Sequence, residues 1–549
     1  MAQAAQQSEG HNGGIDHLLY RGHLQEPVPA WMVFPIIYAG VFLSHWTLLR
    51  LPYFWDEAGY YIPAAYDFFR RGALIPYSTL TNAHPPLPAI YLAMWWKLSG
   101  FAPSVTRLAM CLIAALALTG VFALCRRLMN AEVAAATTLL TGLYPVWFAQ
   151  STLAHADLFA AAGTLWGLYF ALEELPSPMT GWLAVGCFSL AALSKETAIA
   201  TPLALALWHG IEARRKPEQC CSHLRTTAQL TTPLLPLAAW YAYHLHKTGY
   251  LLGNPGFLQY NAVGTLHPLR IALAFAIRIM DVTVYMNLFV PVVCMVAAMF
   301  LPALRNQDGS LRPRVSWNAQ AQIGMVLLGN LLLFSVFGGA LLTRYLLPLY
   351  PLVLLLCVST WRRRVQQWGW LVALSGVAFL AGIFVNPPYR FAPEDNLSYR
   401  DMIQLQQQAI AQLLHRDPHA VVLTAWPVSD ELTKPELGYV RKPVPVVAID
   451  NFSIQQIFLA EQLHGYNTAL VFSTKESSSL PTLLRWGDSG WNQRYFDAHQ
   501  DASPEAVAGL LGGSIVWQNQ RNGLWAAVIQ FPTAQDAHLD ESAPAPVQQ

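Results

Sequence analysis

The stretch LPYFWDEAGYYIPAAYDFF, from Leu51 to Phe69, follows a long apolar run and carries two adjacent carboxylates, Asp56 and Glu57. The preceding run, residues 31–49, is long enough for a membrane helix, because about 20 apolar residues cross a bilayer. Ionisable side chains are costly next to lipid, so those found there are candidates for a function. Why this pair lies at the end of a membrane helix bears on what the protein does.

Composition indicates a polytopic membrane protein. The chain has 549 residues, of which 54% are hydrophobic and only 12% are charged, and its mean hydropathy is +0.32. Soluble domains carry about 25% charged residues. The formal net charge of +1 gives no bulk attraction to nucleic acid, so no nucleic-acid partner is expected.

Eleven apolar segments are expected to form membrane helices. They are residues 30–50, 104–125, 131–150, 155–174, 181–194, 197–210, 228–246, 284–304, 319–338, 343–361 and 368–385. Two short segments, 181–194 and 197–210, meet at Ser194-Lys195-Glu196, where we expect a helical hairpin. A single broken helix is the alternative, and it would give ten spans.

Basic residues between the segments orient the chain. The clusters are Arg126-Arg127, Arg214-Arg215-Lys216, Arg305/Arg312/Arg314 and Arg362-Arg363-Arg364. With eleven spans all four clusters fall on one side, which the positive-inside rule makes cytoplasmic. We therefore expect a cytoplasmic N-terminus, an extracytoplasmic C-terminus and a location in the plasma (inner) membrane if the protein is prokaryotic. Asp56 and Glu57 then face outward.

Four parts are expected along the chain. Residues 1–29 form a disordered cytoplasmic N-terminus, and residues 30–395 form the transmembrane domain, whose outward loop 51–103 carries interfacial helices. A second outward loop is expected over 247–283. Residues 396–532 form an extracytoplasmic α/β domain, and residues 533–549 form a flexible tail.

Short β-rich runs and helical periodicity in the last third of the chain support the α/β assignment. Residues 420–425, 444–450 and 468–473 are expected as strands, and residues 399–415 and 453–464 as helices. Asn522-Gly523 separates two further strands and is a strong hairpin signal.

The ionisable residues near helix ends on the outer face belong to one layer. Besides Asp56 and Glu57 they are His84, Arg107, His155, Asp157, Lys195, Glu196 and Arg344. Such a layer suits the transfer of a group from a lipid-linked phosphate, because a cation stabilises the departing phosphate and a carboxylate takes the proton of the nucleophile. A transporter or flippase is the alternative, and it should carry charges near the middle of the membrane. A receptor without enzymatic activity, which binds a partner through its outer domain, is a third hypothesis.

Five motifs in order resemble the GT-C fold glycosyltransferases, namely the protein O-mannosyltransferases and the bacterial polyprenyl-phosphate sugar transferases such as the lipid A aminoarabinose transferases. The first motif is Trp-Asp-Glu at 55–57 followed by His-Pro-Pro-Leu at 84–87. The others are SVTRLAMCLIAALALTGVFALCRRL, AQSTLAHADLFAA, LSKETA and RYLLPLYPLVLLL. The resemblance covers residues 30–385 and leaves out the C-terminal domain.

The resemblance implies roles for individual residues. Asp56 corresponds to the general base, Glu57 positions that base or the acceptor, and Asp157 matches the second acidic position. Arg344 corresponds to the clamp on the lipid phosphate, His84 lies near that phosphate, and Lys195 and Arg107 are further donor-binding candidates. The implied donor is a polyprenyl (or dolichyl) phosphate-linked sugar, which is transferred with inversion.

Departures from the family pattern leave the acceptor and any cofactor open. Ala83 stands where the aminoarabinose transferases carry a Glu that is a potential metal ligand, and Leu87-Pro88-Ala89 replaces the Gly-Lys of the mannosyltransferases. A divalent metal stays an open question, because no convincing set of ligands is visible, and no other cofactor is expected. The acceptor is a glycan, a lipid or a protein.

Overall fold

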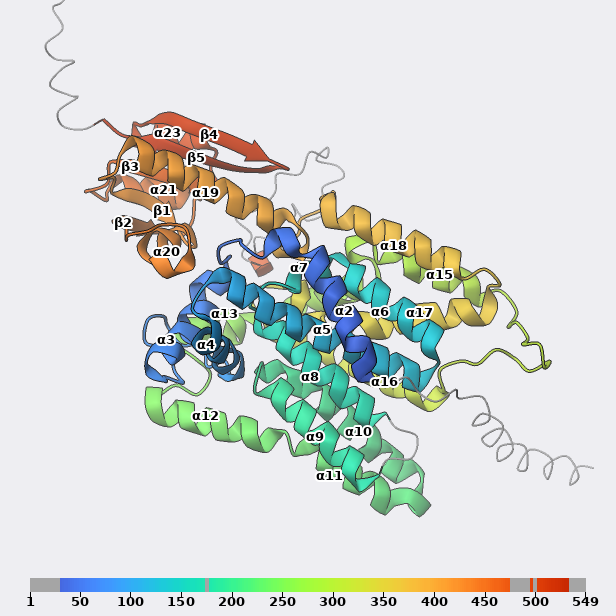
Figure 1. Cartoon of the computed structure of the whole chain (residues 1–549). Helices are drawn as coiled ribbons and strands as arrows, with labels where there is room; N and C mark the ends of the chain where they lie inside the picture. The colour runs from blue at the N-terminus through green and yellow to red at the C-terminus, as the bar shows by residue number, and fades with distance from the viewer. Residues whose placement is uncertain (1–29, 173–176, 474–493, 497–500, 533–549) are drawn as a thin grey trace, which may run out of the picture.

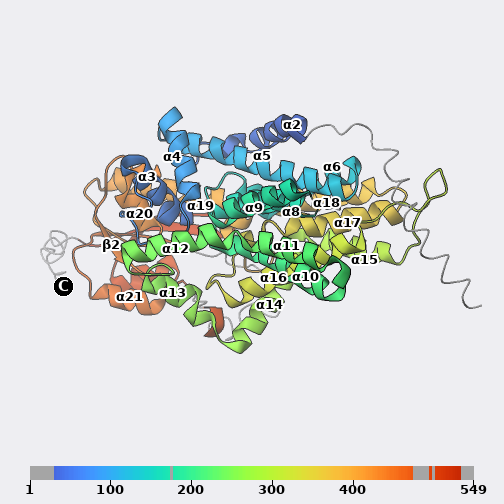
Figure 2. The same cartoon turned by 90° about the horizontal axis from the view of Figure 1, so that it is seen from below.

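The computed structural model describes residues 30–172, 177–473, 494–496 and 501–532. The expected disordered segment 1–29 and flexible tail 533–549 lie outside the described residues. The described chain forms a long helical body with an α/β domain at one end (Figure 1; Figure 2).

The helices of the body are as follows: α2 (Ala30–Ser44), α3 (Ile62–Arg71), α4 (Leu87–Ser99), α5 (Pro103–Leu128), α6 (Ala131–Leu143), α7 (Pro145–Gln150), α8 (Ala156–Ala171), α9 (Pro178–Ala192), α10 (Ala200–Arg215), α11 (Cys220–Thr231), α12 (Leu234–Thr248), α13 (Pro255–Asn261), α14 (Pro268–Thr283), α15 (Phe289–Met299), α16 (Trp317–Val336), α17 (Tyr350–Arg364) and α18 (Gly369–Phe384). Four short helical turns also matter for the site: η3 (Glu57–Tyr61), η4 (Glu196–Ile199), η8 (Thr343–Leu346) and η9 (Pro393–Asp395).

Several expected spans differ from the helices that form. Segment 131–150 is divided at Pro145 into α6 and α7, and segment 228–246 is shared between α11 and α12. The expected loop over 247–283 was wrong in its second half, where α14 forms. Pro268 is the first residue of α14, where the missing backbone N–H of proline costs no helical hydrogen bond. The apolar residues between Arg270 and Arg278 are therefore part of a helix.

Within the described residues, length and composition alone qualify α5 and α16 as membrane-crossing helices, or three spans if α14 and α15, bent by 99°, are counted as one. The apolar helices support a membrane location, while the number of spans and their orientation stay predictions.

Helix α5 packs against α2, α6 and α8. Its buried surface is rich in small residues such as Ala109, Ala114 and Ala117, which allow neighbouring helices to approach closely in a membrane. Both views show α2 lying along the outside of α5 (Figure 1; Figure 2).

The C-terminal domain is a five-stranded mixed sheet with helices, as expected. Its elements are α19 (Ser398–Arg416), β1 (Val422–Ala425), α20 (Val428–Thr433), β2 (Val446–Ile449), α21 (Ile454–Glu461), β3 (Thr468–Phe472), α23 (Pro504–Leu511), β4 (Ser514–Arg521) and β5 (Leu524–Gln530). The strand order is β2-β1-β3-β5-β4, with β1 parallel to β2 and β3, and β5 antiparallel to β3 and β4. The hairpin at Asn522-Gly523 is confirmed, and both residues have the positive φ that such a turn requires.

This domain shares a hydrophobic core with the helical body. Leu48 after α2, Phe148 in α7 and Ile383 in α18 belong to the same buried cluster as the strands of the sheet. The hydroxyl of Tyr439 also donates a hydrogen bond of 3.0 Å to the carbonyl of Tyr53. The α/β domain is therefore fixed against the loop that carries Asp56.

Candidate active site

A cavity of about 1500 Å³ lies where the helical body meets the α/β domain. Its polar end is lined by Asp56, His84, Lys195, Glu196, Arg344 and Glu394. Its apolar wall includes Ile277, Met280 and Val284 from the α14 region and Leu333, Phe334 and Phe337 from the end of α16. The cavity therefore joins a charged cluster to a hydrophobic surface.

Arg344 is the centre of the charged cluster. It lies on η8, is 2% exposed and presents its guanidinium to three carboxylates from separate parts of the chain. Nη2 pairs with Asp56, Nη1 pairs with Glu394, and Nε lies 3.2 Å from Oδ2 of Asp157. Burial makes such pairs dependent on one another, because removing one partner leaves an uncompensated charge.

Asp56 is the most exposed carboxylate of this cluster, and it lines the cavity. It follows the short loop after α2 and precedes η3, and its side chain is 33% exposed. Asp157, in the first turn of α8, is only 2% exposed and does not line the cavity. The two acids therefore differ in access although both pair with Arg344.

Lys195 adds a second cation in the turn between α9 and η4. Its Nζ pairs with Oδ1 of Asp157 and lies 3.8 Å from the centre of the Tyr345 ring. Burial lowers the pKa of Lys195, while the charge of Asp157 opposes that shift. Asp157 is thus held between Lys195 and Arg344.

His84 reaches the same cavity from the loop before α4. Its Nδ1 lies 3.0 Å from Oε2 of Glu196, and its ring is stacked on Tyr61 with 6.0 Å between the ring centres. This pairing holds the imidazole in one orientation at the cavity wall.

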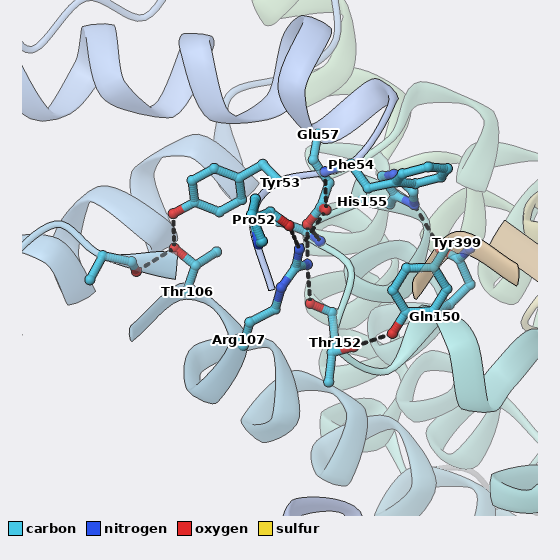
Figure 3. A network of polar contacts seen from close by, with 12 residues as sticks. Pro52, Tyr53, Phe54, Glu57, Thr106, Arg107, Gln150, Thr152, His155 and Tyr399 are labelled. Atoms are coloured by element: carbon cyan, nitrogen blue, oxygen red, sulfur yellow. Dashed lines mark hydrogen bonds and ion pairs between the residues drawn. The ribbon is translucent and has the colours of Figure 1, made fainter. Parts of the chain in front are cut away.

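Glu57 and Arg107 form a separate pair (Figure 3). Both are buried, at 0% and 1% exposure, and Nη2 of Arg107 donates a hydrogen bond of 2.9 Å to Oε2 of Glu57. Glu57 also accepts backbone N–H groups of Phe54 and Ala154, and Arg107 donates to the carbonyls of Pro52 and Thr152. Neither residue lines the cavity, so the pair fastens the loop of Asp56 to α5 and to the loop before α8.

The structure brings together five of the seven predicted site residues, namely Asp56, His84, Asp157, Lys195 and Arg344, and sets Glu57 and Arg107 apart. It also adds residues that sequence reasoning missed. Glu394 and Asp395 come from η9, between the last apolar helix and the sheet domain, and Trp426 comes from the end of β1. The acidic pair after Pro393 was the available signal, since it follows an apolar run as Asp56 and Glu57 do.

Glu394 is a buried acid with a raised pKa. It is 3% exposed, and its Oε2 has no hydrogen-bond partner among the described residues. Burial raises the pKa of Glu394 to about 8, against the lowering effect of Arg344 and with further raising by Asp56, Asp395 and Asp157. A group with this pKa exchanges protons near neutral pH.

Among the described residues, no three His, Cys, Asp or Glu side chains are arranged to hold a metal ion. The acids that gather in the site surround a guanidinium instead.

Comparison with known proteins identifies the fold. The family model described as dolichyl-phosphate-mannose-protein mannosyltransferase matches residues 83–240. The crystal structure of ArnT from Cupriavidus metallidurans is similar over 91% of this chain and 98% of its own, with a TM-score of 0.52 and 14% identity in the apo state. The same protein bound to undecaprenyl phosphate gives a TM-score of 0.51 and 14% identity over the same shares of the two chains. This chain has the GT-C fold.

The expected resemblance is thereby confirmed at the level of the fold, and over 83–240 by the family model. That matched segment of the GT-C fold contains His84, Arg107, Asp157 and Lys195. The Archaeoglobus fulgidus oligosaccharyltransferase is more distant, with a TM-score of 0.45 and 12% identity over 80% of this chain and 67% of its own. No curated protein sequence matches the chain.

Proposed function

We propose that this protein is a membrane glycosyltransferase that moves a sugar from a polyprenyl-phosphate donor to an extracytoplasmic acceptor with inversion. The observation that carries the proposal is the placement of Arg344, a buried cation that lies between an apolar wall and a solvent-accessible carboxylate in one cavity. The GT-C fold and the ArnT structure with undecaprenyl phosphate support it.

The two ends of the cavity suit the two ends of such a donor. The wall formed by residues of the α14 region and α16 accepts a hydrocarbon chain, because its lining is dominated by apolar side chains. Arg344 and Lys195 supply the positive charge that a phosphate needs, and a guanidinium binds phosphate with well-defined geometry. The sugar then lies between these cations and Asp56.

The proposed step makes one bond and breaks one bond. The acceptor oxygen attacks the anomeric carbon from the face opposite to the phosphate, and the bond from that carbon to the phosphate oxygen breaks. Asp56 takes the proton of the acceptor hydroxyl, since it is the most exposed carboxylate of the cluster and lines the cavity. Arg344 and Lys195 stabilise the charge that develops on the leaving phosphate.

The α/β domain is proposed to cover the acceptor side of the site. Trp426 lines the cavity with its ring centre 5.0 Å from that of Trp55, and its indole lies against Gly59. An aromatic wall next to Asp56 provides a surface on which an acceptor packs. The proposal leaves the acceptor as a glycan, a lipid or a protein.

The deciding experiment measures sugar transfer from a polyprenyl-phosphate donor by the purified full-length protein. The Asp56→Asn variant should lower the rate by about 10²-fold or more, because it removes the base. Asp430→Asn is the matched control, since Asp430 is a partly exposed acid in the α/β domain and does not line the cavity. Transfer by Asp56→Asn at the wild-type rate would refute the proposed base. Movement of the lipid across proteoliposomes without a covalent product would instead favour a transporter or flippase.

A further inference from the structure

We infer that Glu394 is the exchangeable partner of Arg344: it occupies the guanidinium in the empty site and leaves it, taking up a proton, when a lipid phosphate binds. This inference rests on the proposed function only in naming the lipid phosphate as the ligand. Glu394 acts through Arg344 and is therefore a positioning residue.

The guanidinium of Arg344 is buried, at 2% exposure, and carboxylates surround it. Each of its three nitrogens faces a different carboxylate, from Asp56, Asp157 and Glu394. A phosphate must approach Arg344 to within hydrogen-bond distance to gain from its charge. The displacement of one carboxylate would give the phosphate a whole edge of the guanidinium.

Asp157 is poorly suited to leave. It pairs with Lys195 as well as with Arg344, and it is buried away from the cavity. Releasing it would leave a buried charge with one cation less. Asp56 is also open to the cavity, so its release is the competing possibility, and the Glu394→Gln variant below distinguishes the two.

Glu394 is suited to leave on three grounds. It lines the cavity, and its second oxygen has no hydrogen-bond partner among the described residues. Its backbone is fixed separately, because Gln150 donates a hydrogen bond of 3.1 Å to its carbonyl. The side chain can therefore rotate away from Arg344 while η9 stays in position.

The charges around Glu394 favour a proton on it once Arg344 turns to the phosphate. The groups that face it are Arg344 on η8, Asp56 before η3, Asp157 on α8 and Asp395 next to it on η9. Asp395 is held by the hydroxyls of Thr343 and Tyr285, and Lys195 lies behind Asp157. With Glu394 ionised, the cations Arg344 and Lys195 face three carboxylates, and an incoming phosphate would add to the excess of negative charge.

The exchange is balanced by one proton. Ionised Glu394, one proton and the lipid phosphate give protonated Glu394 and phosphate bound to Arg344. At a pH of about 8 and above, where Glu394 is ionised in the empty site, the reverse reaction assists release after sugar transfer, because Glu394 returns to Arg344 as it loses its proton and displaces the product phosphate. Product release often limits turnover. A carboxylate that competes with the product phosphate for Arg344 would therefore speed its release.

The test is the affinity for undecaprenyl phosphate, with the full-length protein in nanodiscs, between pH 7 and pH 9. A group that titrates near pH 8 and must be protonated for binding weakens the affinity by about tenfold across this window. The second ionisation of a phosphate monoester lies near pH 6, so it contributes little to the change. Glu394→Gln should bind at pH 7 at least as tightly as the wild type and should lose the pH dependence.

Glu431→Gln is the matched control. Glu431 is a fully buried carboxyl in the α/β domain that does not line the cavity, and this variant should keep the wild-type pH dependence. If Glu394→Gln keeps the pH dependence, Lys195 or another group titrates instead and the inference is wrong. A wild type whose affinity does not change with pH also overturns it.

A second readout needs no variant. Calorimetry of undecaprenyl phosphate binding in buffers of different ionisation enthalpy should show uptake of about half a proton at pH 8. Uptake of no protons at pH 8 contradicts the exchange even if Glu394→Gln fails to fold. Binding is measured apart from sugar transfer, so the failure of the proposed reaction and the failure of this exchange give different results.

Discussion

Mutation of Glu57 should lower the stability of the protein, whereas mutation of the adjacent Asp56 should lower its activity. Glu57 is fully buried and accepts hydrogen bonds from both terminal nitrogens of Arg107 and from two backbone N–H groups. Breaking a buried ion pair by neutralising one partner costs roughly 3–5 kcal/mol, because the other charge is left uncompensated. We therefore expect Glu57→Gln to lower the free energy of unfolding by about that amount.

A double-mutant cycle measures this interaction. Arg107→Leu alone should destabilise by a similar amount, since it strands Glu57, while the double variant should lose less than the sum of the two single variants. The free energy of unfolding is measured by chemical denaturation in detergent, with the affinity for undecaprenyl phosphate determined on the folded fraction. That affinity should stay close to wild type, because neither residue lines the cavity.

Asp56→Asn is the control within the same loop. Asp56 is one-third exposed and shares Arg344 with two other carboxylates, so its neutralisation should leave stability nearly unchanged while it removes sugar transfer. The reasoning is refuted if Glu57→Gln is as stable as the wild type, or if stability losses of the two single variants simply add. In that case Glu57 is no clamp, and a direct role in the reaction returns to consideration.

Two further predictions concern the α/β domain. Burial raises the pKa of Glu431 well above its usual value, so the folded state keeps a proton that the unfolded state loses above about pH 4.3. Its contribution to stability is therefore complete below that pH and is lost as the pH rises toward the folded-state pKa. Glu431→Gln should be more stable than the wild type at pH 7. Its free energy of unfolding should also fall less steeply as the pH rises, by up to about 1.4 kcal/mol per pH unit. Chemical denaturation from pH 5 to pH 8 measures this slope, and a slope equal to that of the wild type would contradict the prediction. Trp426→Ala should raise the KM for the acceptor and leave undecaprenyl phosphate affinity unchanged, with Trp426→Phe as the milder control, and a loss confined to donor affinity would count against an acceptor wall.

Removing the α/β domain would be a poor test of its role. The domain shares a buried core with Leu48, Phe148 and Ile383 of the helical body. Deletion would expose that apolar surface and destabilise the whole protein. A point change at Trp426 alters the cavity and leaves this shared core in place.

Local patterns in the sequence were sufficient for much of the architecture. The strands near 420–425, 444–450 and 468–473 form as expected, and so does the hairpin at Asn522-Gly523. A two-residue turn is fixed by its own φ angles, and short strands follow from β-branched and apolar runs between turn residues. The expected loop over 247–283 failed in its second half, because the Gly, Asn and Pro residues that indicate a loop all lie within 249–268. The apolar run that follows forms α14, and only packing reveals that its two arginines are buried.

The same division applies to the site. The sequence by itself determined that Asp56, Asp157, Lys195 and Arg344 are ionisable residues at the ends of apolar segments, because such residues are rare and costly there. Only the tertiary structure decided that Asp56 opens into the cavity while Glu57 is sealed against Arg107, and that Glu394 completes the ring of acids around Arg344. Asp56 and Glu57 are adjacent in the sequence and share the same flanking residues. The exposure of each side chain and the charges it pairs with depend instead on helices and turns that folding brings together.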